Sequence, residues 1–192
     1  MLTDLRRSVI ALAVFTLLTG LAYPLVIFGV GQVAFSGAAD GSVVERDGRA
    51  VGSSLIGQPF SDDRYFWGRP SAAGQDGYDP TASGASNLGP TSKQLAEEVA
   101  GRLAALLKAN PGKTAADVPA ELVTASGSGL DPDISPAAAE FQVDRVARAR
   151  GIEPAAVRRL VRAHTAGRTF GVFGEPRVNV LNLNLALDAA QR

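Results

Sequence analysis

The chain has 192 residues, a length that suits one globular domain with a short additional segment. Its 19 basic and 19 acidic side chains cancel, so no overall charge favours binding to nucleic acid or to an anionic membrane surface. The absence of cysteine excludes disulfides and thiolate chemistry, and a single histidine leaves little material for a histidine metal site. Aromatic residues are only 6% of the chain while glycine and proline are plentiful, which predicts a loop-rich domain with a modest core.

A long uncharged segment follows the first eight residues. Its apolar body, residues 9–35, exceeds the roughly 20 residues that a helix needs to span a bilayer. The alternative is a secretory signal peptide with a small-residue cleavage site at residues 20–22, but such a peptide has an apolar core of only about 7–15 residues. We therefore predict an uncleaved transmembrane anchor over residues 9–35, with a kink at Pro24 because proline removes a helical hydrogen bond.

The basic residues around this anchor predict its orientation. Arg6 and Arg7 lie immediately before it, whereas Arg46 and Arg49 lie well after it and are balanced by acidic neighbours. The positive-inside rule then places residues 1–8 in the cytoplasm and residues 40–192, as a soluble domain, outside the cytoplasmic membrane.

The start of the external domain carries two local patterns. Two short β-prone runs flank Asp47-Gly48, a dipeptide typical of a tight hairpin turn. An unusually aromatic segment, residues 55–72, follows and contains interleaved arginines, a combination that also occurs in single-strand nucleic-acid binders. We interpret this segment as a hydrophobic plug under a long loop, since the membrane anchor argues against nucleic acid.

A helix is expected to begin at Thr91, because Thr91-x-x-Gln94 fits a capping box, and to end at residues 110–112. Its apolar residues recur at helical spacing and make one face. These residues are Leu95, Val99, Leu103, Leu106 and Leu107.

The most informative stretch is residues 122–151. A loop of small hydroxylated residues and glycines, residues 124–129, precedes a helix whose signals are Ser135 as N-cap, Pro136 at the first position and Gly151 as a left-handed C-cap. Such a loop before a helix N-terminus is either an anion-binding geometry or a tight connection in which hydroxyls and glycines satisfy the turn. The absence of a lysine from the loop favours the tight connection.

The last part of the chain predicts a helix pair and a strand. Pro154 opens a second helix after Gly151, and leucines then alternate with polar or small residues over residues 181–188. This period of two is typical of a half-buried strand, which we expect to pair with the early hairpin. The predicted fold class is α+β: a single N-terminal transmembrane helix followed by one loop-rich domain with a small β-sheet and several helices.

The chemistry of an enzyme is missing from these patterns. The only histidine, His164, has no serine or carboxylate signature around it that would make a catalytic triad. Clusters with metal-ligand spacing are absent from the sequence, and one membrane span cannot enclose a pore by itself. The residues therefore indicate a non-catalytic, membrane-anchored accessory domain.

Ordered sequence blocks carry a resemblance to a known family. The sequence resembles the KdpC family, the C subunits of the Kdp potassium-transporting ATPases, over nearly the whole chain after the anchor. The blocks are SSLIGQPF, YFWGRPSA, SGASNLGPTS, LVTASGSGLDPDISPAAAEFQVDRVARARG and HTAGRTFGVFGEPRVNVLNLNLALD.

The resemblance implies a one-span subunit of a bacterial inner-membrane complex that imports potassium at the expense of ATP. The implied partners are a channel-like potassium-binding subunit, which carries the ion, and a P-type ATPase subunit, which carries the enzymatic activity. Members are described as catalytic chaperones that raise the ATP affinity of the ATPase subunit. The residues that we associate with such a nucleotide role, by resemblance only, are Thr124, Ser126, Ser128 and Gln142.

The predicted topology conflicts with a direct contact to ATP, because ATP is cytoplasmic and the domain is expected outside. An external domain would more naturally cap or stabilise the side from which potassium enters. The alternative from another functional class is a membrane-anchored periplasmic binding or adhesion module.

Overall fold

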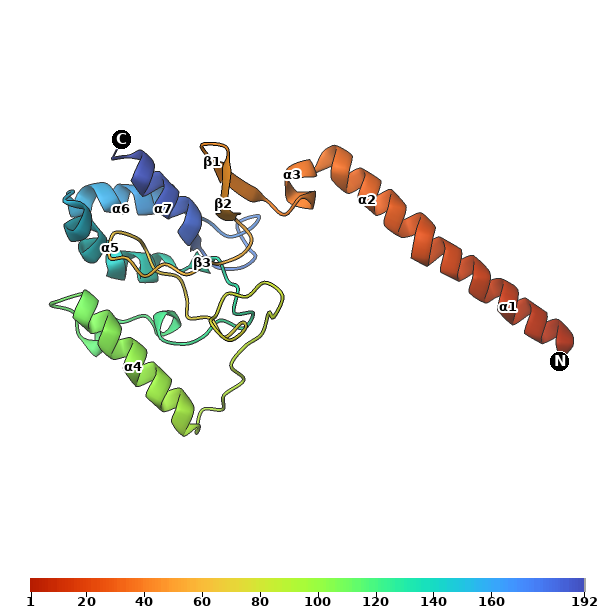
Figure 1. Cartoon of the computed structure of the whole chain (residues 1–192), viewed down its shortest axis with the longest axis horizontal. Coiled ribbons are helices and arrows are strands. Elements are labelled where there is room, and N and C mark those ends of the chain that lie inside the picture. Colours follow the sequence, from red (N-terminus) through yellow and green to blue (C-terminus); the bar gives the residue numbers. More distant parts are fainter. Residues whose placement is uncertain (192) are drawn as a thin grey trace. The chain divides into compact units, whose positions relative to one another are not determined.

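The computed structural model describes residues 1–191 and divides the chain into two compact units. The first unit ends at Val43 and the second begins at Val44, and each is shown in Figure 1. The division follows the sequence, since an uncharged apolar segment gives way there to a mixed polar and apolar one.

The first unit is almost entirely helical. It contains α1 (Leu2–Leu17), a π-helical segment (Leu18–Ala22), α2 (Tyr23–Ala34) and the short α3 (Ser36–Ala39). From Leu2 to Ala34 the helix is long and apolar enough to cross a membrane, as its length and composition show. This helix fits the single membrane span that the sequence predicts.

The irregularity expected at Pro24 takes the form of the π-helical segment. Proline has no backbone N–H, so Pro24 cannot donate to the carbonyl four residues earlier. The turn before it is widened, and the Tyr23 N–H donates five residues back to the carbonyl of Leu18. The backbone thus accommodates proline by a local change of helical pitch.

The second unit begins with the predicted hairpin, formed by β1 (Val43–Arg46) and β2 (Arg49–Ser53). Asp47 and Gly48 both have positive φ, 53° and 74°, as a tight turn of the mirror-image type requires. The prediction of this hairpin is confirmed.

A long loop region then leads to α4 (Lys93–Ala109). Its N-cap is Ser92, whose side chain accepts a hydrogen bond from the Leu95 N–H, so the helix starts one residue later than a Thr91 cap predicts. Two 3-10 turns, η2 (Ala115–Asp117) and η3 (Ala120–Leu122), follow. 

The helix pair predicted from caps is present as α5 (Pro136–Arg150) and α6 (Pro154–Ala163). Ser135 accepts a hydrogen bond from the Ala138 N–H, and Gly151 adopts the left-handed conformation with φ 66°. Local residue chemistry alone therefore fixes both ends of α5.

Three very short strands make a second sheet in the order β3-β5-β4. They are β3 (Asp133–Ile134), β5 (Arg177–Asn179) and β4 (Thr165–Ala166), all antiparallel. Val178 is the centre of the register, because it lies opposite Ile134 on one side and Thr165 on the other.

The prediction of a strand over residues 181–188 is wrong. The backbone turns into α7 (Val180–Ala189) directly after β5, and the Asn179 side chain caps it by accepting from the Asn182 N–H. Leucine alternation misleads here because this helix is buried on several sides, so its polar residue Asn184 is as buried as Leu183 and Leu187. The hairpin consequently forms its own sheet and has no strand partner at the C-terminus.

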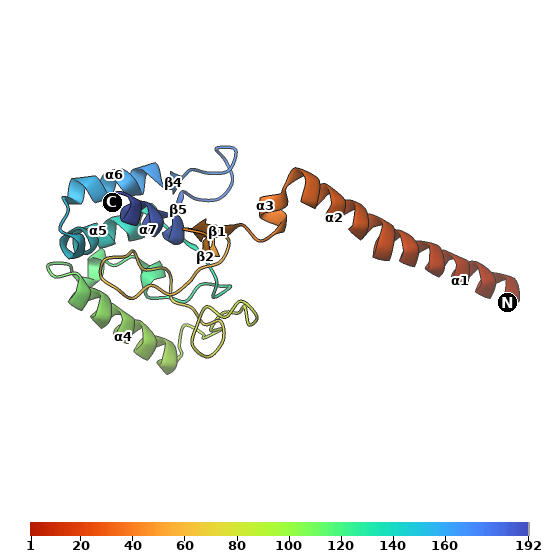
Figure 2. The same cartoon turned by 45° about the horizontal axis from the view of Figure 1, so that its top comes forward.

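The core of the second unit lies where α5, α6 and α7 meet the aromatic segment. Figures 1 and 2 show α5, α6 and α7 close together, with the central loops between them and α4. The most buried apolar side chains include Phe66, Ala139, Val143, Val146, Val157, Leu183 and Leu187. Phe60 and Trp67 pack against this core, so the interpretation of the aromatic segment as a hydrophobic plug is confirmed.

Candidate functional site

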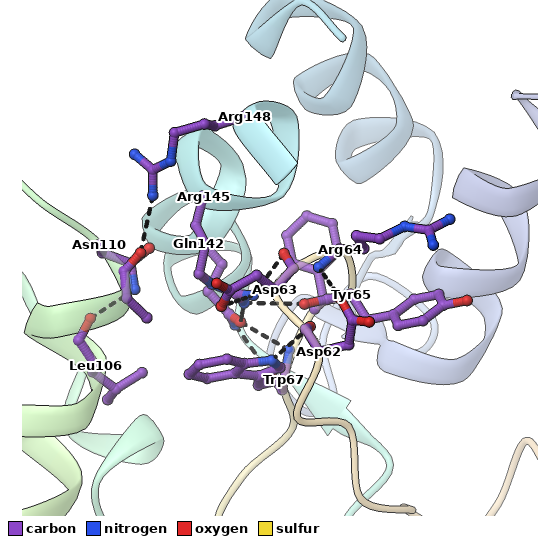
Figure 3. Close-up of polar contacts among 12 residues, drawn as sticks. Asp62, Asp63, Arg64, Tyr65, Trp67, Leu106, Asn110, Gln142, Arg145 and Arg148 are labelled. Carbon is purple, nitrogen blue, oxygen red and sulfur yellow. Dashed lines mark hydrogen bonds and ion pairs between the residues drawn. The ribbon is translucent and has the colours of Figure 1, made fainter. Parts of the chain in front are cut away.

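The most polar part of the interior is the line of contact between α5 and the aromatic segment (Figure 3). Gln142 lies on the buried face of α5, and its side-chain amide pairs with the backbone of Trp67 in both directions. The Trp67 N–H donates to Gln142 Oε1 at 2.8 Å, and Gln142 Nε2 donates to the Trp67 carbonyl at 3.1 Å. The amide also donates to the Ala138 carbonyl, so the Gln142 side chain joins the backbone of α5 to the backbone of the aromatic segment.

Arg145 completes this line from one helical turn further along α5. Its guanidinium donates to the carbonyls of Asp63 and Tyr65 at 2.8 and 3.0 Å and to Gln142 Oε1 at 2.7 Å. The same group lies over the Trp67 ring, with its central carbon 3.9 Å from the ring centroid.

Burial has a large electrostatic effect on Arg145. The side chain is inaccessible to solvent, while its carboxylate neighbour Asp63 is largely exposed at 3.6 Å. Burial therefore lowers the pKa of the Arg145 guanidinium to about 10, although the Asp63 charge opposes the shift. At neutral pH the group is still a cation, held by carbonyl oxygens and an aromatic face.

A second charged cluster joins the aromatic segment to the hairpin and the C-terminal helix. Asp188 of α7 accepts from Arg150 at 2.8 Å, from Arg46 of β1 at 2.8 Å and from the Tyr65 hydroxyl at 3.2 Å. Burial raises the pKa of this carboxyl. The hydrogen bonds from Arg150, Arg46 and Tyr65 lower it by more than burial raises it, so the pKa lies below its ordinary value of 3.8. One carboxylate thus connects three segments of the domain.

A cavity of about 290 Å³ is lined in part by Trp67. Its walls are mainly apolar and aromatic, and they include Phe60, Trp67, Tyr78, Leu106 and Leu122. Two arginines also reach it, but each is already paired with a carboxylate: Arg69 with Asp131 at 3.0 Å and Arg102 with Glu98 at 2.9 Å. The cavity therefore suits an uncharged apolar group better than an anion.

The loop of residues 124–129 does not lead directly into α5, because β3 lies between them. Its backbone instead holds neighbouring loops in place: the Ser126 N–H donates to the Pro70 carbonyl at 3.0 Å, and the Gly84 N–H donates to the Ser128 carbonyl at 2.8 Å. Ser126 is buried, whereas Ser128 is exposed. The geometry is that of a tight connection between loops.

The N-terminus of α5 is occupied by a carboxylate of the chain itself. Glu121 accepts hydrogen bonds from the Ser135 N–H at 3.2 and 3.3 Å and from the Ser135 hydroxyl. A negative group at this end of a helix is favoured by the helix dipole. An external anion at the same place would meet the Glu121 charge.

The four residues associated with a nucleotide role do not converge on one free polar surface. Thr124 donates to the Ala120 carbonyl at 2.9 Å, and Ser128 accepts from the Leu130 N–H at 3.1 Å. Gln142 uses its side-chain amide to bond to Trp67, whereas the Ser126 N–H bonds to the carbonyl of Pro70, another residue of the aromatic segment. The nucleotide role of these residues stays a prediction.

Sequence reasoning missed the residues that organise this region, namely Arg145, Glu121 and Asp188. A signal was present for Arg145, which lies three positions after Gln142 and therefore on the same helix face. The partners of Asp188 and Glu121 lie 14 to 142 residues away, and no local pattern points to them. Over the described residues, acidic and histidine side chains form no group of three or more that would hold a metal ion.

Comparison with known proteins gives consistent results along the chain. The family described as "KdpC: K+-transporting ATPase, c chain" matches residues 5–189. A protein of Burkholderia vietnamiensis named potassium-transporting ATPase KdpC subunit is 59% identical over 191 residues, which are 100% of this chain and 98% of that protein. The protein of the same name from Sorangium cellulosum is 60% identical, and the match covers 100% of this chain and 100% of that protein. The one from Methylococcus capsulatus is 53% identical, and the match covers 98% of this chain and 99% of that protein.

Proposed function

Because the chain belongs to the KdpC family, the c chains of potassium-transporting ATPases, we propose that it is a non-catalytic accessory subunit that stabilises assembly of such a complex. The observation that carries the proposal is the extent of the match, residues 5–189, which includes both the membrane-length helix and the folded domain. A free binding or adhesion module is not favoured, since relatives that cover this chain end to end are named as ATPase subunits.

The proposed division of labour leaves the chemistry to the partners. A channel-like subunit binds and conducts potassium, and a P-type ATPase subunit hydrolyses ATP. The buried polar contacts favour a non-catalytic role for this chain, because Gln142, Arg145 and Asp188 bond to other parts of the same domain.

We also propose that the chain lies in the bacterial cytoplasmic membrane with its N-terminus inside and its domain outside. The charged flank Arg6-Arg7 supports this orientation by the positive-inside rule. In this orientation the domain stabilises or caps the side from which potassium enters the complex.

The proposed assembly role is tested by co-purification. An affinity tag on this chain should recover two larger membrane proteins from mild detergent in a constant ratio. Membranes that contain those partners but lack this chain should give less intact complex and less potassium-stimulated ATP hydrolysis. Recovery of a fully assembled, fully active pair of partners without this chain would contradict the proposal.

A finer proposal, which rests on the family resemblance, is that the subunit raises the ATP affinity of the ATPase subunit. The described residues fit a triphosphate poorly: Glu121 occupies the α5 N-terminus, Gln142 is buried, and the cavity arginines Arg69 and Arg102 are paired with carboxylates. We therefore propose that any such effect is transmitted through subunit contacts, without ATP held by this domain.

The test is a double variant, Ser126→Ala with Ser128→Ala, in the assembled complex. We expect the ATP concentration for half-maximal potassium-stimulated hydrolysis to stay unchanged. The melting temperature and assembly should fall, because the Leu130 N–H loses its acceptor, Ser128 Oγ, and the buried Ser126 hydroxyl is removed. A clear rise in the ATP requirement with normal stability and assembly would show that the loop contributes to ATP affinity directly.

A further inference from the structure

The loop that connects β4 to β5 carries three large apolar side chains into solvent. Phe170, Val172 and Phe173 expose 90%, 68% and 67% of their surface, and together they are here called the apolar tip. Single exposed apolar residues are ordinary on protein surfaces, but three within four positions form a patch that marks an interaction site. In the second unit, the other large hydrophobic residues found exposed are Leu55 and Ile56, which are not part of this loop, although Leu55 borders a pocket with Ala166 and Arg177 at its base.

The backbone holds the apolar tip in a fixed shape. The Thr169 N–H donates to the Phe173 carbonyl at 2.8 Å, and the Phe173 N–H donates back to the Thr169 carbonyl at 2.9 Å. Between them, Phe170 has φ 53° and Gly171 has φ 74°, so the chain turns with two consecutive left-handed residues. A bulky side chain at positive φ is disfavoured by about 1–2 kcal/mol, so the surrounding turn must hold the Phe170 backbone in this conformation.

The charges at the base of the tip are neutralised within the domain. Arg168 donates to both carboxylate oxygens of Glu175 at 2.8 Å, and Arg177 pairs with Asp133 at 3.2 Å. An apolar centre with a paired, solvent-exposed polar rim is the composition of a protein–protein contact. Attachment to an anionic lipid surface would instead call for an excess of basic residues, which the tip does not have.

We propose that the apolar tip docks into a hydrophobic pocket on another subunit of the potassium-transporting ATPase. The inference rests on the proposed function, because it takes the partner to be a chain of the same complex, as membership among c chains implies. Preordered aromatic side chains lose little freedom on docking, so Phe170 and Phe173 are suited to contribute much of the binding energy of such a contact. A fluid lipid layer has no pocket of complementary shape, so an ordered loop would gain no extra binding energy there.

The first experiment removes the apolar surface without disturbing the turn. In the complete complex, Phe170→Asn is combined with Phe173→Thr; asparagine tolerates left-handed backbone, and threonine suits the short bridge to Thr169. Recovery of partner subunits with the tagged chain should fall by about tenfold or more in mild detergent. The matched control is Leu55→Gln, which removes an exposed apolar side chain near the base of the loop but outside the apolar tip and should leave recovery unchanged.

The second experiment identifies what the tip contacts. A photo-reactive benzoyl-phenylalanine at position 172 should, on irradiation of native membranes, cross-link this chain to one partner subunit. Cross-links to lipid alone, to a second copy of this chain, or to nothing would overturn the proposal, as would undiminished recovery of the double variant or an equal loss in Leu55→Gln. Normal fluorescence of Trp67, the single tryptophan, checks that each variant is folded.

The failure of this inference is distinguishable from failure of the proposed function. If the unmodified chain does not co-purify with partner subunits, the accessory role is wrong. If it co-purifies but the tip variant does so equally well, the accessory role stands and the docking surface lies elsewhere.

Discussion

The guanidinium of Arg145 lies 3.9 Å from the centre of the Trp67 ring, in a place that solvent does not reach. The charge is compensated by carbonyl oxygens of Asp63 and Tyr65 and by Oε1 of Gln142. A buried charge is tolerated only when it is paired or fully hydrogen-bonded. The aromatic segment therefore depends on α5 for its path, and α5 depends on the segment for two of the acceptors of its arginine, whose buried Nε finds no hydrogen-bond partner among the described residues.

Replacing Arg145 with methionine should lower the free energy of unfolding by about 3 kcal/mol, because one buried and two partly buried acceptors lose this donor at once. Denaturant unfolding of the full chain in detergent can be followed by the fluorescence of Trp67, the only tryptophan. The control is Arg148→Met on the same helix, which removes one exposed hydrogen bond to the Ala109 carbonyl and should change stability by about 0.5 kcal/mol or less. Equal losses in the two variants would contradict a special role for Arg145.

Asp188→Asn tests the cluster that joins α7 to Arg46, Arg150 and Tyr65. The folded-state pKa of Asp188 lies below its unfolded value of 3.8, so its charge stabilises the domain above that value and ceases to do so as pH falls through the folded-state pKa. At pH 7 the variant should unfold more easily by about 2 kcal/mol, a value reduced from that of a fully buried pair because the site is partly hydrated.

The pH dependence of this difference is the sharper observation. Unfolding of Asp188→Asn and of the unmodified chain should converge as the pH is lowered below about 4. Asp76→Asn, in an exposed turn, serves as the control. A stability difference that stays constant from pH 7 to pH 3 would show that the lost side-chain geometry, and not the charge, is responsible.

Two glycines of the loop at residues 124–129 give a matched pair. A Cβ at Gly129 would lie 2.7 Å from Ala73 Cβ and 2.7 Å from the Gly84 carbonyl oxygen, and φ there is +68°. At Gly127 a Cβ would meet nothing within 4 Å. Gly129→Ala should therefore lower the melting temperature by several degrees or prevent folding, while Gly127→Ala stays within about 0.5 kcal/mol of the unmodified chain.

The orientation in the membrane can be tested because the chain has no cysteine of its own. A cysteine in place of the exposed Ser128 should react with a membrane-impermeant thiol reagent in intact cells whose outer membrane has been made permeable. A cysteine in place of Thr3, before the apolar residues 9–35, should react only after the cytoplasmic membrane is opened. The reverse pattern would place the domain in the cytoplasm.

Elements specified by local chemistry could be predicted from the sequence. Ser135, Pro136 and Gly151 define both ends of α5, and Asp47-Gly48 defines the hairpin, because caps and tight turns depend on the residues at those positions. The start of α4 was displaced by one residue, since Thr91 and Ser92 are both competent caps. These features need no knowledge of the rest of the fold.

What could not be predicted depends on contacts between distant residues. The leucine alternation after Asn179 indicated a strand because the pattern alone does not reveal a helix buried on several sides. The burial of Arg145 and the convergence on Asp188 follow from packing that brings residues about 80 to 140 positions apart into contact. A charged residue on a helix is ordinarily placed in solvent, so the spacing of Arg145 from Gln142 is the one local signal, and Asp188 has none.

The link between Arg46 and Asp188 spans 142 positions and has a consequence for biosynthesis. A ribosome makes the hairpin long before α7, so the carboxylate that binds the hairpin and the aromatic segment emerges 142 residues after Arg46. These contacts of the domain must wait until α7 has been made, as in other folds with widely separated partners. Until then the hairpin and the aromatic segment lack the carboxylate that holds both of them to α7, so this part of the domain folds only after a long delay in synthesis.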